Sequence, residues 1–167
     1  MAIINVLVAF DAKTILKKYS LSMQPDSPTL IDGNDIYMIT TRDHVVSEQS
    51  GSELNIKAEV EDVIHWREAS VSIPEYSVIL YHFNASSGGS LIDKPQPDII
   101  PRVMVPMPSK DENGNIIIEL VPTQDYYWSA NVLSAGSVTY QFWFQVVDRR
   151  GNTLGYGRWD PFITISN

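Results

Sequence analysis

The alternation of apolar and polar positions is strongest between residues 138 and 147. One side of this stretch carries five apolar side chains, namely Val138, Tyr140, Phe142, Phe144 and Val146. A period of two with aromatic residues on the denser face is typical of a half-buried β-strand. Turn residues follow at 148–152, and a second extended run covers residues 154–165. The two runs predict a hairpin whose apolar face another sheet must cover.

The rest of the chain is also mostly extended. Residues 3–10 form a continuous apolar run, which predicts a strand buried on both faces. Further strands are predicted at residues 36–40, 54–60, 63–69, 76–84, 116–121 and 126–133. Residues 103–107 are predicted as a short edge strand because prolines surround them. An Asn-Gly pair within residues 110–115 predicts a hairpin turn.

One helix is predicted, at residues 12–19. Asp11 is suited to cap its first turn, and Lys17 and Lys18 lie near its C-terminal end. Two segments are predicted as long loops: residues 22–35, and residues 85–101 with their Ser, Gly and Pro. With turns about every ten residues and little helix, we predict an all-β fold, an antiparallel β-sandwich of Ig-like or jelly-roll-like type. It forms a single domain over residues 1–167, with one short helix after the first strand.

The composition narrows the range of partners. The formal net charge is −8, whereas nucleic acids and anionic membranes require a positive face on the protein. We therefore expect no nucleic acid and no membrane as a partner. The chain has no cysteine, which excludes disulfides and thiolate metal sites. The first residues lack the basic segment and cleavage site of a signal peptide. We expect a cytoplasmic protein, with release by a route without a signal peptide left open.

No residue pattern in the chain identifies a reaction. His44, His65 and His82 have neither the H-x-H nor the H-x-x-x-H spacing of a metal site. A Gly-x-Ser-x-Gly elbow, a P-loop and a dinucleotide fingerprint are missing as well. Gly155-Tyr156-Gly157 lies within a predicted strand, where glycines favour close approach of another backbone or a bulge. We therefore predict a protein that is not an enzyme and requires no cofactor.

Three short segments combine acidic, amide and aromatic side chains in predicted loops or at strand ends. They are Asp32-Gly33-Asn34-Asp35, Gln124-Asp125-Tyr126-Tyr127-Trp128 and Trp159-Asp160-Pro161. Carboxylate and amide oxygens suit calcium, and aromatic faces beside polar groups suit sugars. The same residue types also form turns and fill cores. The candidate ligand-binding residues are Asp32, Asn34, Asp35, Asp125, Tyr127, Trp128, Trp159 and Asp160; of these, Asp32, Asn34, Asp35 and Asp125 are also candidate calcium ligands.

Several segments together resemble the PixA/AidA family of bacterial inclusion-body proteins. They are residues 5–11, 55–58, 62–67, 78–81, 124–128 and 155–162, of which the opening strand and the ending Trp159-Asp160-Pro161-Phe162 are the most specific. The resemblance spans nearly the whole chain. It implies an abundant, regulated bacterial β-sandwich protein that in some members accumulates in cytoplasmic inclusions, with links to host interaction and quorum-regulated expression. It transfers no catalytic residues, and five Met are no methionine enrichment of the kind found in some members.

Two functional hypotheses follow. In the first, the protein is a lectin-like module that binds carbohydrate, with calcium as an optional aid: the acids hold a cation or sugar hydroxyls, and an aromatic ring stacks on the sugar. In the second, it is a self-assembling storage or structural protein without a small-molecule ligand. Edge strands and apolar patches would then join copies, first as a homo-oligomer with two-fold symmetry, a dimer. The sequence favours the first hypothesis narrowly.

Overall fold

The structure is a computed structural model that describes residues 1–32 and 34–167. Within these described residues, twelve strands and one α-helix follow one another. In chain order they are β1 (Ile3–Phe10), α1 (Ala12–Lys18), β2 (Thr29–Leu30), β3 (Ile36–Ile39), β4 (Val45–Ser47), β5 (Asn55–Glu59), β6 (Val63–Ser70), β7 (Tyr76–Ser87), β8 (Gln96–Lys110), β9 (Ile116–Asn131), β10 (Gly136–Asp148), β11 (Thr153–Trp159) and β12 (Phe162–Ser166). A short 3-10 helix, Arg42–His44, precedes β4.

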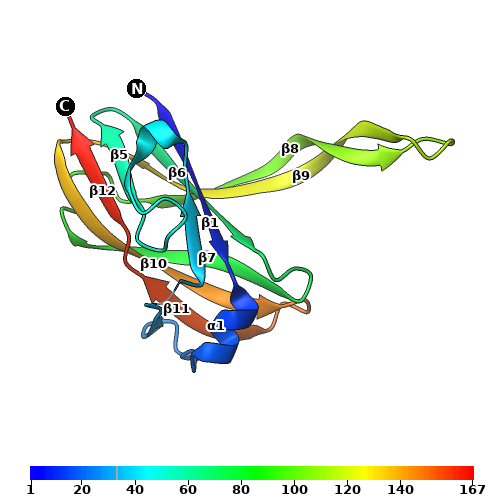
Figure 1. The fold of residues 1–167 in the computed structure, drawn as a ribbon, viewed down its shortest axis with the longest axis horizontal. Helices are drawn as coiled ribbons and strands as arrows, with labels where there is room; N and C mark the ends of the chain where they lie inside the picture. Colours follow the sequence, from blue (N-terminus) through cyan, green and yellow to red (C-terminus); the bar gives the residue numbers. More distant parts are fainter. Residues whose placement is uncertain (33) are drawn as a thin grey trace.

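The strands form two sheets that enclose one core (Figure 1). The five-stranded sheet has the order β3-β1-β6-β9-β8, and in the seven-stranded sheet the order is β2-β11-β10-β12-β5-β4 with β7 also on β10. The prediction of an all-β sandwich with one short helix after the first strand is confirmed. The sheets are mixed, however, because β1 pairs with β6, β2 with β11 and β5 with β12 in parallel. Residue periodicity carries no information on strand direction.

The inward face of β10 forms the centre of the core, as the alternation predicts. Tyr140, Phe142 and Phe144 are fully buried. The hydroxyl of Tyr140 accepts a hydrogen bond of 3.0 Å from Nε1 of Trp66 in the opposite sheet. Aromatic rings from both sheets contact one another here, so the two layers are joined by aromatic packing together with this buried hydrogen bond.

The glycines of β11 lie where side chains, and not another backbone, come close. A Cβ atom on Gly157 would lie 2.4 Å from Cζ of Phe144. Gly155 has φ +152° and faces the side chain of Leu21 in the same way. The extended run predicted at residues 154–165 is two strands, because Asp160-Pro161 separates β11 from β12.

The first strand differs from its prediction. Residues 3–8 of β1 alternate between exposed and buried positions, and the strand is buried on both faces only at residues 8–10. Ile3 and Leu7 are exposed because they point to the outer face of the five-stranded sheet. The helix that follows matches its prediction to within a residue, and the carboxylate of Asp11 accepts a hydrogen bond of 3.1 Å from the amide of Thr14 at its first turn.

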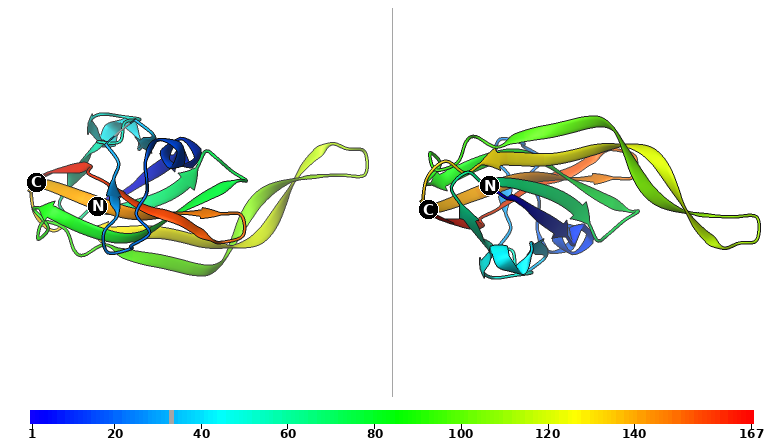
Figure 2. Two further views of the ribbon diagram at one scale, coloured as in Figure 1. Left: turned by 90° about the horizontal axis from the view of Figure 1, so that it is seen from below. Right: turned by 90° about the horizontal axis from the view of Figure 1, so that it is seen from above.

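The greatest difference from the predicted elements lies in β8 and β9. The predicted loop at residues 85–101 shrinks to residues 88–95, because β7 and β8 extend into it. The predicted edge strand and the two predicted strands after the turn are parts of two continuous strands of 15 and 16 residues. β6 pairs with β9 only as far as the pair Trp66–Trp128. Beyond it, residues 101–124 form a hairpin that projects from the sandwich (Figures 1 and 2); we call this hairpin the arm.

Candidate functional site

The acids beside α1 are engaged within the protein. Nζ of Lys18 donates to the carboxylate of the buried Asp35 at 2.8 and 2.9 Å, and this hydrogen bond raises the pKa of Lys18. The hydroxyl of Tyr19 donates to the carboxylate of Asp32 over 3.0 Å. Asn34 is exposed, and Gly33 of the same predicted cluster lies outside the described residues. These contacts hold the loop against the helix.

The two candidate tryptophans lie on inward-facing positions of their strands. Trp128 is buried, and its Nε1 donates over 2.8 Å to the hydroxyl of Tyr126. Trp159 is 1% exposed and stacks on Phe142, with 5.9 Å between ring centroids. In this structure neither indole ring presents a face to solvent, so both act as core residues here. Next to Trp159, Asp160 is partly buried, and its Oδ1 has no hydrogen-bond partner.

The remaining two candidates meet at the root of the arm, on the outer face of the five-stranded sheet. The guanidinium of Arg67 forms a salt bridge with Asp125 and lies 4.5 Å from the ring centroid of Tyr127. The ring of His65 lies 4.5 Å from the same tyrosine ring. We call these four residues the root cluster. Sequence reasoning missed Arg67 and His65 as members because β6 and β9 are far apart in the chain.

Electrostatics in the root cluster follow from these contacts. The hydrogen bond from Arg67 lowers the pKa of the Asp125 carboxyl. Loss of hydration and the charge of Arg67 lower the pKa of His65, which favours the neutral imidazole. The cluster therefore offers a carboxylate, a guanidinium and two aromatic rings on one surface, which is a combination that polar ligands can use.

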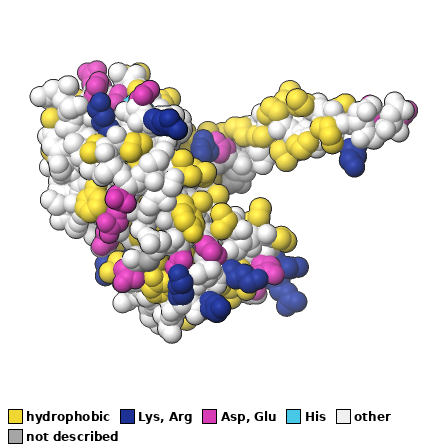
Figure 3. Space-filling view, viewed as in Figure 1, with side chains coloured by type: hydrophobic (Ala, Val, Ile, Leu, Met, Phe, Trp, Pro, Cys, Tyr) yellow, Lys and Arg dark blue, Asp and Glu magenta, His cyan; other side chains and the backbone are white. Residues whose placement is uncertain are grey.

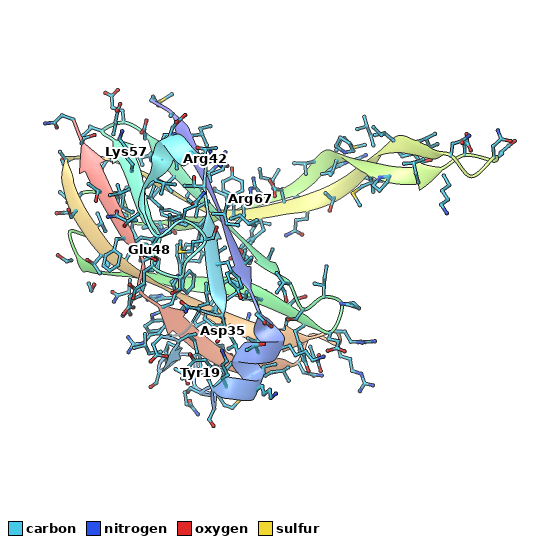
Figure 4. All side chains as sticks on the ribbon, viewed as in Figure 1. Tyr19, Asp35, Arg42, Glu48, Lys57 and Arg67 are labelled. Carbon is cyan, nitrogen blue, oxygen red and sulfur yellow. The ribbon has the colours of Figure 1, made fainter. Side chains whose placement is uncertain are left out.

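The predicted acids are not brought to one place. Asp35 and Tyr19 lie beside α1, whereas Arg67 lies at the root of the arm toward the other side of the sandwich (Figure 4). Within residues 1–32 and 34–167, no group of three or more His, Asp or Glu side chains is arranged to hold a metal ion. Two of the four candidate calcium ligands, Asp35 and Asp125, instead form salt bridges with cationic side chains.

One further acid lies beneath the fork where β9 leaves β6. The side chain of Glu68 points inward, and its Oε2 is buried without a hydrogen-bond partner. Loss of hydration raises the pKa of Glu68 to about 7. The hydroxyl of Tyr126 nearby donates to the carbonyl of Leu80 over 2.6 Å. The Glu68 carboxyl and the Tyr126 hydroxyl are thus polar groups at this end of the core.

The arm carries many exposed apolar side chains. Register and alternation place one set of side chains on a single side of the hairpin: Met104, Pro106, Pro108, Lys110, Ile116, Ile118, Leu120 and Pro122. We call this side the arm face, and all its members except Lys110 are apolar. Ile118 is 76% exposed and Leu120 is 62% exposed. Hydrophobic side chains cover much of the arm in the space-filling view (Figure 3).

The opposite side of the arm is more polar and less exposed. It carries Ser109, Glu119 and Thr123 among its apolar residues. The arm is thus amphipathic, with the apolar side turned to solvent. The sequence held a signal for this surface, because Pro106 and Pro108 alternate before the Asn-Gly turn and an apolar run beginning with three isoleucines follows it. Prolines also favour a short edge strand, so the pattern predicts an edge strand at residues 103–107 and not the long hairpin.

The comparisons with known proteins give one family and one fold. A family model described as "PixA: Inclusion body protein" matches residues 2–165. The crystal structure of a PixA inclusion body protein from Burkholderia cenocepacia J2315 has a TM-score of 0.83 and 18% identity, covering 99% of this chain and 96% of that one. This second likeness shows the fold alone.

Other comparisons add little. A cysteine protease inhibitor from Entamoeba histolytica has a TM-score of 0.27 and 8% identity, covering 67% of this chain and 84% of that one. Amebosin has a TM-score of 0.28 and 7% identity, covering 84% of this chain and all of that one (100%). Neither carries an argument. No curated protein matches the chain. None of the helices in the described residues is long and apolar enough to cross a membrane.

Proposed function

Because the chain belongs to the PixA inclusion body protein family, we propose that it is a non-enzymatic bacterial protein whose role is to self-associate through the arm and accumulate in cytoplasmic inclusions. The exposed arm face carries this proposal. A two-stranded hairpin is barely stable alone in water, and a contiguous exposed apolar patch of this kind marks an interaction site. A second copy of the chain is the partner that an abundant protein meets most often.

The charge of the protein supports ordered rather than general association. The formal net charge of −8 repels copies at long range and favours solubility. Contact is therefore favoured where apolar area is concentrated and charge is sparse. The arm face meets this condition, since Lys110 is its only charged member. We accordingly expect the homo-oligomer, a dimer at first, to form through the arm and to weaken when a charge is placed there.

Light scattering over a concentration series tests the proposal. The wild-type mass is expected to rise from the monomer value of 18.8 kDa toward twice that value. Ile118→Lys places a charge on the arm face without disturbing the core, because this side chain is 76% exposed. It should shift the association to at least tenfold higher concentration. Met23→Lys is the matched control, since Met23 is 59% exposed but lies outside the arm.

Two results would contradict self-association through the arm. A wild-type chain that keeps the monomer mass at the highest soluble concentration would leave the arm without a role in assembly. Equal effects of Ile118→Lys and Met23→Lys would show that replacing any exposed apolar side chain by lysine weakens the association, with no special role for the arm. Circular dichroism in the aromatic region would verify that both variants keep the native core.

A ligand-binding role is the second candidate function, and the root cluster favours it. A lectin-like site for carbohydrate needs an aromatic ring beside polar groups, and Tyr127 lies beside Arg67 and Asp125. Calcium would add charge to the carboxylate oxygens, which are the ligands that it prefers. Under this proposal Asp125 has to exchange its salt bridge for the cation or for sugar hydroxyls. The root cluster replaces the wider set of acids and tryptophans as the proposed contact surface.

Thermal unfolding with calcium, EDTA and a panel of sugars tests this second candidate. A ligand that prefers the folded state raises the unfolding midpoint by mass action. The rise should disappear in Asp125→Ala and persist in Asp32→Ala, because Asp32 lies in the other cluster. An unchanged midpoint with every sugar and with calcium would contradict the ligand-binding role. A rise that both variants keep would move the ligand site away from the root cluster.

A further inference from the structure

The turn at the tip of the arm determines which backbone groups of β9 are free. The amide of Asp111 donates to the carbonyl of Asn115 over 3.0 Å, so these residues close the ladder as a hydrogen-bonded pair. In an antiparallel ladder such pairs alternate with pairs whose N–H and C=O groups point away from the partner strand. Along the register, the groups of Ile116, Ile118 and Leu120 therefore point away from β8.

Prolines on β8 give the same alternation independently and block the opposite edge of the arm. Pro106 pairs with Leu120 and Pro108 pairs with Ile118. A proline has no N–H to donate, which is consistent with both pairs being the non-hydrogen-bonded ones. The two prolines also remove consecutive outward donors from β8, so regular addition of a strand along that edge is prevented.

The edge of β9 along residues 116–121 is open by contrast. Its only charged side chain is Glu119, and no proline occurs before Pro122. Among the residues that the structure describes, β6 ends its pairing with β9 at Trp128 and no other strand takes its place. A row of free N–H and C=O groups on a straight edge is a template for another strand.

We propose that two copies of this chain join edge to edge along β9, antiparallel, with a two-fold axis at Ile118; this rests on the proposed self-association through the arm. In this register Ile118 faces the partner's Ile118, and Ile116 faces the partner's Leu120. Their outward groups form hydrogen bonds with one another, and the two arms become one continuous sheet. Because the arm projects beyond the sandwich (Figure 1), the two bodies lie at opposite ends without collision.

The neighbouring registers are less favourable. An axis at Glu119 places two carboxylates directly opposite each other on one face, and it also sets Ile116 against the partner's Pro122. An axis at Ile117 sets Leu120 against the partner's Gly114, which lies in the turn with φ +82°. Of these three registers, the one at Ile118 uses every free position of the edge. A two-fold axis is also the symmetry that joins identical patches into a closed dimer.

Cysteine cross-linking tests the register on a clean background, because the chain has no cysteine. Ile118→Cys sets two Cα atoms about 5.5 Å apart in the dimer, a separation that a disulfide spans. Ile116→Cys is the matched control on the same edge. Its two Cα atoms lie about 14 Å apart, four residues along the strands, which is too far. A mixture of Ile116→Cys and Leu120→Cys chains brings the two different cysteines opposite each other.

Full-length variants are oxidised mildly at a concentration where light scattering shows the wild-type dimer. Ile118→Cys should become mainly a disulfide-linked dimer, Ile116→Cys alone should yield at least tenfold less, and the mixture with Leu120→Cys should link again. If Ile118→Cys stays unlinked or links no better than Ile116→Cys while the protein remains dimeric, the edge pairing is wrong and the arm instead docks on the partner's body. A monomeric wild-type chain would overturn both the edge pairing and the self-association.

Discussion

Replacing Glu68 by glutamine should change how the stability of the protein depends on pH. Glu68 lies under the fork between β6 and β9, and its Oε2 is buried without a hydrogen-bond partner. Because burial disfavours the charged form, the pKa of Glu68 is about 7 in the folded protein against an ordinary 4.5. The folded state therefore holds a proton that the unfolded state has lost between these two pH values.

The size and the sign of the effect follow from this difference. The stabilising contribution is fully present below pH 4.5 and is lost as the pH rises through about 7. Each pKa unit corresponds to about 1.4 kcal/mol, so the free energy of unfolding should fall by roughly 2 to 3 kcal/mol. The lower value allows for solvent screening, because the Glu68 side chain is partly exposed. Glu68→Gln stays neutral and should not show this loss.

Urea unfolding at pH 5 and pH 8 measures the free energy of unfolding in both forms. The wild type should be less stable at pH 8 than the Glu68→Gln variant, and the two should approach each other at pH 5. Glu53→Gln is the control, because Glu53 is exposed. The lowered pKa of His65 makes its own contribution to stability change with pH in the opposite direction. This contribution is the same in the wild type and in Glu68→Gln, so it cancels in the comparison. A parallel pH dependence of wild type and Glu68→Gln would refute the assignment of the buried charge.

Two further predictions concern the core. Gly157→Ala should lower the free energy of unfolding by about 1 to 3 kcal/mol, because the new Cβ would lie 2.4 Å from Cζ of the buried Phe144. Urea unfolding measures this change. A variant as stable as the wild type would contradict the prediction and show that the ring can move aside. Tyr140→Phe should cost about 1 to 3 kcal/mol, because it leaves the buried Nε1 of Trp66 without its 3.0 Å partner. Thermal unfolding checks this, and an unchanged midpoint would contradict it.

Local patterns predicted those elements whose burial alternates clearly. The aromatic positions of β10 could be assigned because one face of a strand in a sandwich is apolar at every second residue. The helix α1 could be assigned because a capping Asp11 and C-terminal lysines mark both of its ends. A close approach at the glycines of β11 could be predicted, because a glycine in a strand leaves room for atoms from another part of the chain. The family resemblance was confirmed independently by the family model over residues 2–165.

What could not be predicted depends on contacts between distant residues or on solvent exposure. Apolar residues at 116–121 predict a strand, but nothing local shows that this strand leaves the sandwich. Prolines such as Pro106 favour a short edge strand, although at a non-hydrogen-bonded position they leave the ladder of a long strand intact. The partner of Asp125 was missed because Arg67 reaches it only after β6 and β9 pair. The burial of Trp128 and Trp159 could not be predicted either, because it depends on the opposite sheet that covers them.

Amide hydrogen exchange of the wild-type chain at low and high protein concentration tests the edge-to-edge pairing of the arms most directly. In the monomer, the amides of Ile116, Ile118 and Leu120 are free, whereas those of Ile117 and Glu119 are bonded to β8. Edge pairing should protect the amides of Ile116, Ile118 and Leu120 from exchange as the protein concentration rises. The exchange rates of amides in the sandwich core should stay unchanged. Exchange at those three positions that remains fast in a solution where the protein has already associated would contradict it.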